Sequence, residues 1–300
     1  MMGDNTLTDA VHWRFREDSN PYVRGLKVAL VQMAVGSDKA KNVASAVKQI
    51  HRAKEAGAQL VALPECFNSP YGTKFFDEYA EEVPSGATSR ALSKAAAETG
   101  VCVVGGSVPE RFGNKLYNTC TVWDGSGKLL AQHRKVHLFD IRIPNKMTFR
   151  ESEVLSPGDQ ITTFDLAGIK IGVCICYDLR FYEMLHLMAQ EGCALIICPA
   201  AFNMTTGPRH WELLARSRAN DLQLWMALVS PARDTTAAYV AWGHSMLVDP
   251  WGSVVGQLKE SEGTLIHEVD VKVVEEVRNN IPVRTQRRTD LYETVKKFKK

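Results

Sequence analysis

Apolar runs alternate with amphipathic stretches along most of the chain. The run LKVALVQMAV at 26–35 predicts a buried strand, and the following stretch, 38–56, places Val43, Val47 and Ile50 on one face at helical spacing. Further strands are predicted at QLVALPE, VCVVGGS, IKIGVCIC and ALIICP, and further helices at about 86–99, 179–191 and 209–220. Two hairpins are predicted at the turns DGSG and DPWG. This order of strands and helices predicts an α/β fold.

The pattern also repeats itself, at an offset of 135 residues. In order along the chain, the residues His51, Gly57, Leu60, Pro64, Phe67, Asn68 and Gly72 match His186, Gly192, Leu195, Pro199, Phe202, Asn203 and Gly207. Each half therefore predicts a sheet with helices on one face only. Because the other face of such a sheet must also be buried, we expect the two sheets to pack face to face. The prediction is a four-layer α-β-β-α sandwich with internal pseudo-symmetry, and a single doubly wound sheet is the alternative.

Composition and charge narrow the classes of partner. The chain has 300 residues, is 45% apolar and 23% charged, and carries a formal net charge of +2, which is ordinary for a globular protein. It has no long basic run before its C-terminal KKFKK and no nucleic-acid recognition motif, so no nucleic-acid partner is expected. No apolar stretch approaches the roughly 20 residues that span a bilayer, so no membrane association is expected either.

Residues 1–24 are interpreted as a poorly defined N-terminal extension and residues 25–300 as a single domain. The extension lacks the apolar core of a signal peptide, and its acidic residues argue against a transit peptide. The seven cysteines lie mostly in apolar runs, which suits free thiols in a reducing compartment. We therefore expect a cytoplasmic protein, and the sequence leaves a mitochondrial pool open.

Two cysteines lie two apart in the stretch GVCICYDLRF. Cys174 is inside the apolar run and is interpreted as core packing, whereas Cys176 is the last residue before a polar turn and a predicted helix. Ligands gather at the carboxyl ends of strands in α/β sheets, and a helix N-terminus favours a thiolate, so Cys176 is the candidate nucleophile. A reactive thiol needs a base or a cation nearby. Glu65 and Lys135, which also follow predicted strands, are the candidates.

Other chemistries have little support in the sequence. Motifs of nucleotide-binding loops and zinc proteases are missing. His133 and His137 are four residues apart but have no matching cysteine pair, and Cys174 and Cys176 lack the spacing of a zinc site. A metal site is therefore disfavoured.

Three motifs together resemble the nitrilase superfamily of carbon–nitrogen hydrolases. They are ALPE with Glu65, HRKVHL with Lys135 and GVCICYDLRF with Cys176, and the similarity covers about residues 26–292. Longer blocks are similar to the omega-amidase branch, among them LPECFNSPYG, KVHLFDIRIPNKMTFRES, AFNMTTGPRHWELLARSRA and YVAWGHSMLVDPWG. One departure is Leu222 in RANDLQLWM, where an asparagine is expected; it bears on local packing more than on chemistry.

The resemblance implies the α-β-β-α fold, a homodimer, no cofactor and a small-molecule amide substrate. An omega-amidase hydrolyses the terminal amide of alpha-ketoglutaramate or alpha-ketosuccinamate to the dicarboxylic keto acid and ammonia. By the resemblance, Cys176 attacks the amide carbon and forms a thioester, with Glu65 as the base. Lys135 and the backbone N–H of Tyr177 would hold the oxyanion, and Glu151 in TFRES would position Lys135 and the substrate.

The same resemblance suggests how the substrate is bound. Arg180 is the candidate partner of the alpha-keto carboxylate, and a structural ion pair is the alternative. Phe202 and Thr206, in AFNMTTG, would line the pocket. The rival functions are an amidase for deaminated glutathione or N-carbamoyl compounds, a nitrile hydrolase, and a non-catalytic protein on the same fold. The last is disfavoured because all three motif residues are present.

Overall fold

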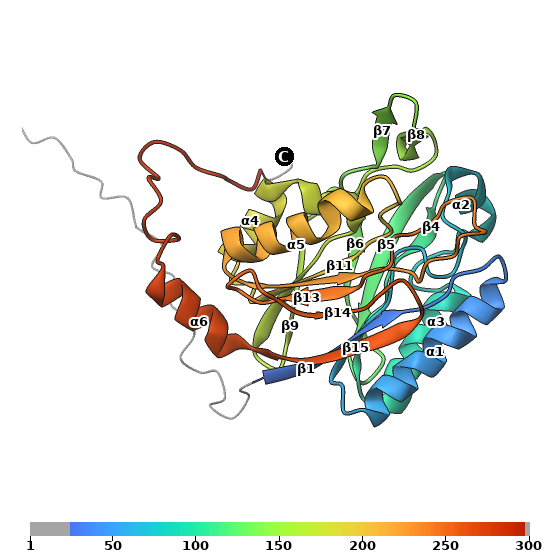
Figure 1. The fold of residues 1–300 in the computed structure, drawn as a ribbon. Coiled ribbons are helices and arrows are strands. Elements are labelled where there is room, and N and C mark those ends of the chain that lie inside the picture. The colour runs from blue at the N-terminus through green and yellow to red at the C-terminus, as the bar shows by residue number, and fades with distance from the viewer. Residues whose placement is uncertain (1–24, 298–300) are drawn as a thin grey trace, which may run out of the picture.

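The computed structural model describes residues 25–297, in which two β-sheets pack against each other (Figure 1). Within these residues the first sheet has the order β15-β1-β2-β3-β5-β4, with β6 paired to β5, and the second has the order β14-β13-β12-β11-β10-β9. The strands of the first sheet are β1 (Gly25–Gln32), β2 (Leu60–Ala62), β3 (Cys102–Val104), β4 (Val108–Phe112), β5 (Lys115–Trp123), β6 (Leu129–Arg134) and β15 (Gly263–Asp270). Those of the second are β9 (Thr162–Leu166), β10 (Ile169–Val173), β11 (Leu195–Pro199), β12 (Trp225–Val229), β13 (Met246–Val248) and β14 (Val254–Gln257).

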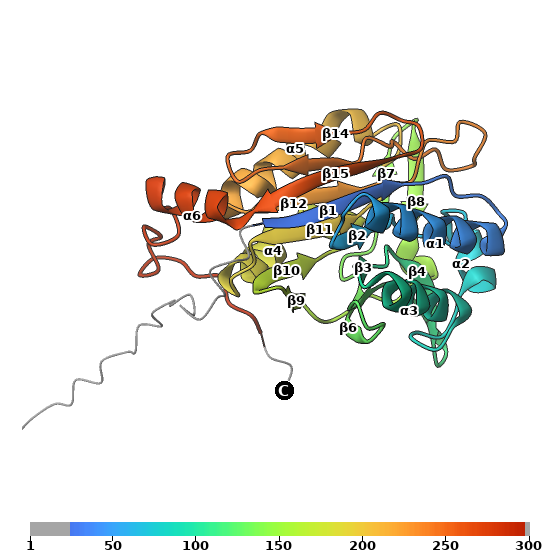
Figure 2. The same ribbon diagram turned by 90° about the horizontal axis from the view of Figure 1, so that it is seen from below.

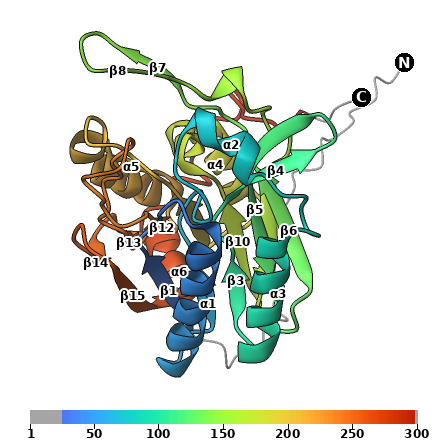
Figure 3. The same cartoon turned by 90° about the vertical axis from the view of Figure 1, so that its right-hand side faces the viewer.

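Helices cover the outer face of each sheet. The α-helices are α1 (Lys39–Glu55), α2 (Thr73–Tyr79), α3 (Ala87–Thr99), α4 (Tyr182–Gln190), α5 (Gly207–Leu222) and α6 (Val271–Asn280), and two short 3-10 helices are η1 (Glu151–Glu153) and η2 (Cys176–Arg180). Helices α1 and α3 lie on the first sheet, and α4 and α5 lie on the second (Figures 1 and 3). A hairpin of β7 (Asp140–Ile143) and β8 (Met147–Arg150) projects beyond both sheets (Figure 3).

The alternation of side chains along β1 shows why the sheets stack. Leu26, Val28 and Leu30 are buried in the core between the two sheets, whereas Ala29 and Val31 are buried against α1 and α3. Burying a side chain of this size contributes about 1.5–3 kcal/mol, so both faces favour folding. The predicted four-layer α-β-β-α sandwich is confirmed.

The two sheets repeat one topology, which confirms the predicted pseudo-symmetry. In the first sheet β1, β2 and β3 are parallel, and in the second β10, β11 and β12 are parallel. Each trio continues into antiparallel strands, β5 and β6 or β13 and β14. An antiparallel neighbour also flanks each first strand: β15 beside β1, which lie side by side in Figure 2, and β9 beside β10. Strand β4 and the β7–β8 hairpin fall outside this repeat.

Local signals set the helix ends. Asp38 caps α1, since its Oδ1 accepts a hydrogen bond from the backbone N–H of Lys41 at 3.0 Å. Helix α3 ends at Gly100, whose φ of +69° is in the left-handed region and whose N–H donates to the carbonyl of Ala96 at 2.8 Å. Among residues 25–297, every helix is too short or too polar to span a membrane. The prediction for residues 1–24 lies outside the described residues.

The strand predicted to run through Cys176 is shorter than expected. Strand β10 ends at Val173, and Cys176 begins η2 with a φ of +47°. The alternation that would place Cys174 and Cys176 on one strand face therefore does not extend to Cys176. Helix α4 begins at Tyr182 rather than near 179, because η2 occupies the intervening residues.

Candidate active site

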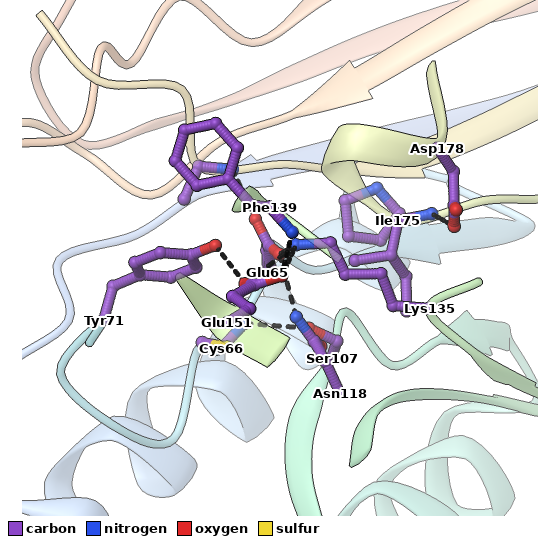
Figure 4. A network of polar contacts seen from close by, with 12 residues as sticks. Glu65, Cys66, Tyr71, Ser107, Asn118, Lys135, Phe139, Glu151, Ile175 and Asp178 are labelled. Atoms are coloured by element: carbon purple, nitrogen blue, oxygen red, sulfur yellow. Dashed lines mark hydrogen bonds and ion pairs between the residues drawn. The ribbon is translucent and has the colours of Figure 1, made fainter. Parts of the chain in front are cut away.

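Lys135 lies at the centre of the site, directly after β6. Its side chain is fully buried, and Nζ donates to Oε1 of Glu65 at 3.0 Å and to Oε1 of Glu151 at 2.9 Å (Figure 4). The three side chains come from the segments that follow β6, β2 and β8. Isolated buried charges are costly, so this pairing is what permits a buried lysine here. Burial opposes the charged form, but Glu151 and Glu65 outweigh it and raise the pKa of Lys135 well above its usual value.

Glu65 is held by both of its carboxylate oxygens. Besides Lys135, Oε1 accepts from Nδ2 of Asn118 at 2.9 Å, and Oε2 accepts from the backbone N–H of Ala201 at 2.8 Å. Burial raises the pKa of Glu65, while the Lys135 ammonium and a hydrogen bond with the Cys176 side chain oppose that rise. The carboxyl group is therefore in contact with the thiol and is a stronger base than an exposed glutamate.

Glu151, the second carboxylate bound to Lys135, is also held by both of its oxygens. It begins η1, and its Oε1 accepts from the Tyr71 hydroxyl at 2.7 Å (Figure 4). Its Oε2 accepts from the backbone N–H of Phe139 at 2.7 Å. Both oxygens thus accept hydrogen bonds from the protein, which suits Glu151 to holding the ammonium in place.

Cys176 lies beside this charged group and is 4% exposed. Burial, followed by the Glu65 carboxylate, raises the pKa of the thiol well above its usual value, and Lys135 only partly offsets this. The thiol is therefore neutral at pH 7 and needs a base to become nucleophilic. The ring of Tyr177, the next residue, packs edge-on against Phe139 at 5.2 Å between centroids. The fold thus brings together four residues that were selected from the sequence: Glu65, Lys135, Glu151 and Cys176.

Cys174 has a different environment. It is fully buried in the core, and its side chain hydrogen-bonds to the Cys198 side chain. Its backbone N–H donates to the carbonyl of Ile197 at 3.2 Å, which continues the pairing of β10 with β11. Burial raises the pKa of the Cys174 thiol, as it does for Cys176, but Glu65 does not contact it through any hydrogen bond within residues 25–297.

The residues predicted to bind the substrate form a second group. The Arg180 guanidinium lies 5.0 Å from the ring centroid of Phe202 and 5.7 Å from that of Tyr177. Its Nη1 is 3.3 Å from Nδ1 of His210. Among residues 25–297 it forms no ion pair with a carboxylate, so the alternative of a structural ion pair has no support in this part of the chain.

A cavity of about 240 Å³ is lined in part by Glu65. Tyr71 and Tyr239 line it, with ring centroids 4.4 Å apart. Phe202 and Thr206, expected at the pocket, are not among its lining residues. Phe202 packs instead edge-on against Trp211, at 5.2 Å between centroids. The backbone N–H of Thr206 donates to Oδ1 of Asn203 at 3.0 Å, where the chain enters α5.

Three residues of the site were not selected from the sequence. Asn118 binds Glu65, Tyr71 binds Glu151, and Tyr239 donates its hydroxyl to the carbonyl of Ala201 at 2.5 Å. Only Asn118 carries a signal in the sequence, because a polar side chain within a long apolar strand needs a buried partner. The two tyrosines come from loops whose approach depends on the complete fold.

Comparisons with known proteins agree with this geometry. Residues 27–279 match the family model described as carbon-nitrogen hydrolase. The omega-amidase NIT2 of Xenopus tropicalis is 52% identical over 271 residues, which are 90% of this chain and 98% of that protein. The crystal structure of Saccharomyces cerevisiae Nit3, a member of branch 10 of the nitrilase superfamily, has a TM-score of 0.81 and 42% identity, and covers 88% of this chain and 97% of that one. A mutant amidase of Nesterenkonia sp. AN1, which shows covalent addition of the acetamide moiety of fluoroacetamide at the active site cysteine, has a TM-score of 0.72 and 25% identity, and covers 88% of this chain and 98% of that one.

Proposed function

The chain belongs to the carbon–nitrogen hydrolase family, and we propose on this premise that it is an omega-amidase. Its substrates would be alpha-ketoglutaramate and alpha-ketosuccinamate, each hydrolysed at the terminal amide to the dicarboxylic keto acid and ammonia. The observation that carries the chemistry is the contact of one buried glutamate, Glu65, with both the Lys135 ammonium and the Cys176 thiol. The substrate class rests on the identity to curated omega-amidases over nine-tenths of the chain.

Acylation begins when the Cys176 sulfur attacks the amide carbon. Glu65 takes the thiol proton as the S–C bond forms, and it returns that proton to the nitrogen as the C–N bond breaks and ammonia leaves. The carbonyl re-forms as a thioester. The raised pKa of the thiol supports this order of events, because a neutral thiol must give up its proton to a base that already touches it. The adduct at the cysteine of the Nesterenkonia amidase supports a nucleophilic role of the same kind.

Deacylation reverses the roles. Water attacks the thioester carbon, Glu65 takes a proton from that water, and the Cys176 thiolate leaves and recovers the proton. The Lys135 ammonium and the Tyr177 backbone N–H would stabilise the oxyanion in both steps, and one such donor contributes on the order of 3 kcal/mol in other enzymes. Glu151 would hold Lys135 in place, since it accepts a hydrogen bond from the same nitrogen.

The carboxylate of the substrate would bind Arg180. That guanidinium is partly exposed, sits above the Phe202 ring and is close to the Cys176 turn, four residues away in sequence. Phe202 would support the guanidinium from below, and Thr206 would lie next to it at the start of α5. A planar guanidinium can bind a carboxylate through two parallel hydrogen bonds, which fixes the direction of the substrate.

We also propose a cytoplasmic homodimer in which residues 25–300 form one domain. All seven cysteines are free thiols, which suits a reducing compartment. The two sheets share one continuous core, which supports a single domain over the described residues. The homodimer rests on the resemblance to the family.

Ammonia release from a panel of amides tests the substrate assignment. We expect kcat/KM to be highest for alpha-ketoglutaramate and alpha-ketosuccinamate, with a Cys176→Ala variant as the blank. A higher value for deaminated glutathione, or for an N-carbamoyl compound, would assign the protein to a neighbouring branch instead.

A further inference from the structure

His133 and His137 lie two residues before and two residues after Lys135 in the sequence. Both side chains bind the carboxylate of Asp178. Nε2 of His133 is 3.1 Å from Oδ2 of Asp178, and Nδ1 of His137 is 2.8 Å from its Oδ1. Asp178 is fully buried two residues after Cys176. Spacing alone made the histidine pair a weak metal candidate, but their shared partner is this aspartate.

Asp178 also binds the backbone on both sides of the site. Its Oδ2 accepts from the N–H of Ile175, the residue before Cys176, at 3.0 Å (Figure 4). Its Oδ1 accepts from the N–H of His137 at 2.8 Å. A carboxylate offers about four acceptor sites, and all four are used here. The Asp178 N–H in turn donates to the carbonyl of Ile175 at 3.0 Å, which closes the turn.

This network holds an unfavourable backbone conformation. Cys176 has a φ of +47°, which costs a non-glycine residue on the order of 1 kcal/mol or more and persists only where neighbours enforce it. The Asp178 carboxylate accepts a hydrogen bond from Ile175, the residue just before Cys176. The other ends of the network are also anchored: the His137 ring stacks on Phe181 at 3.6 Å, and Nδ1 of His133 is 3.0 Å from Oγ1 of Thr162.

The Asp178 carboxylate is ionised when it accepts these hydrogen bonds. Burial alone raises the pKa of Asp178, but the hydrogen bonds from His133 and His137 outweigh burial and hold it well below the usual value. An ionised carboxylate only accepts hydrogen bonds, so Nε2 of His133 and Nδ1 of His137 both carry protons. Bonds of this charge-assisted kind are about twice as strong as neutral ones.

We propose that Asp178 is a positioning residue that ties the segment carrying Lys135 to the turn carrying Cys176. Through His133 and His137 it fixes the oxyanion-binding cation, and through Ile175 it fixes the nucleophile. The inference rests on the proposed roles of Lys135 and Cys176. A misplacement of about 1 Å between reacting groups can cost 100-fold in rate, so this link bears on kcat more than on substrate binding.

Asp178→Asn is the first test. An asparagine side chain has one oxygen and one NH₂ group. The NH₂ group replaces one of the two carboxylate oxygens, so the two hydrogen-bond donors that faced that oxygen lose their acceptor. We expect kcat for the keto-acid amide to fall about 100-fold with KM changed only a few-fold. Alkylation of Cys176 by iodoacetamide, a small neutral amide, should slow as well. Unchanged kcat and unchanged alkylation would overturn the proposal.

Glu110→Gln is the matched control. Glu110 is a fully buried carboxylate of β4 that binds Arg134 and Gln132, whose side chains are on the opposite face of β6 from His133. It should lower the melting temperature as Asp178→Asn does but leave kcat near the wild-type value. Equal losses of kcat in the two variants at equal loss of melting temperature would reduce Asp178 to a merely structural residue.

Substitutions at His133 keep the inference testable if Asp178→Asn does not fold. His133→Gln places an amide nitrogen near the former Nε2 and should retain most of kcat, whereas His133→Leu removes the donor and should not. Equal kcat in the two variants would contradict the proposal. If the wild-type protein hydrolyses no keto-acid amide, the proposed function fails, and the alkylation rates of Cys176 still decide whether Asp178 positions it.

Discussion

Nζ of Lys135 lies 3.0 Å from Oε1 of Glu65, and neither side chain is exposed to solvent. A buried ion pair gains little net stability from its charges, because desolvation offsets most of the attraction. The pair is therefore better explained by the proposed chemistry than by folding: in that proposal the cation stabilises the oxyanion, and the carboxylate takes the proton of the thiol.

Lys135→Met should abolish most activity and also destabilise the fold. Removal of the ammonium takes away an oxyanion donor, for which a loss of about 100-fold or more in kcat is expected. It also leaves Glu65 and Glu151 buried without a cation, and a broken buried pair typically costs about 3–5 kcal/mol. Steady-state kinetics and urea denaturation measure the two effects. Lys170→Met, which breaks the exposed pair with Asp165, is the control and should change neither. Retention of kcat within a few-fold would contradict the assigned role.

Arg180→Ala should select against charged substrates. Loss of a charge-assisted pair lowers kcat/KM for alpha-ketoglutaramate on the order of 10- to 100-fold, whereas a neutral primary amide should lose far less. Arg209→Ala is the matched control, because its guanidinium binds the carbonyl of Thr205 near the start of α5, the helix that carries His210 beside Arg180. Equal losses for charged and neutral amides would show that Arg180 does not bind the carboxylate.

Glu151→Gln should move the acid limb of the pH profile. Glu65 must be ionised to act as a base, so kcat/KM falls as pH drops through its pKa. Burial raises that pKa, and the negative charge of Glu151 raises it further. Removing the charge should therefore shift the acid limb to lower pH, even though the maximum of kcat/KM also falls. A profile measured for both proteins checks this, and a shift toward higher pH would contradict the assignment of Glu65.

His186 should make stability fall at mildly acidic pH. Burial, together with Arg287 and Arg284, lowers the pKa of His186 to about 4. The imidazole of His186 takes up a proton near pH 6.5 in the unfolded chain but not in the folded chain. The free energy of unfolding is therefore unaffected by this group above about pH 6.5 and decreases as pH falls toward 4. The free energy of unfolding, measured by urea denaturation at several pH values between these limits, should change less steeply with pH for His186→Gln than for the wild type. Identical slopes would show that His186 is not buried in its neutral form.

Much of this arrangement could be predicted from the sequence because it depends on strand ends. Glu65 follows a short apolar strand, Lys135 follows the second strand of a predicted hairpin, and the repeat at 135 residues indicated two equivalent sheets. The positions of both side chains then follow from the general geometry of α/β folds.

The rest depends on contacts that periodicity does not encode. The apolar run continues through Ile175, yet the strand ends at Val173, because Asp178 draws Ile175 into a turn through its carboxylate. The expectation for Phe202 and Thr206 came from the resemblance alone, and neither residue lines the cavity that reaches Glu65.

The most direct measurement is a search for the acyl group on Cys176. The protein is mixed with alpha-ketoglutaramate, quenched in acid within one turnover and analysed by tandem mass spectrometry, with Cys174→Ala and Cys176→Ala in parallel. We predict a thioester on Cys176 in the wild type and in Cys174→Ala, and none in Cys176→Ala. An adduct that persists in Cys176→Ala, or that is lost in Cys174→Ala while that variant remains folded, would contradict the account.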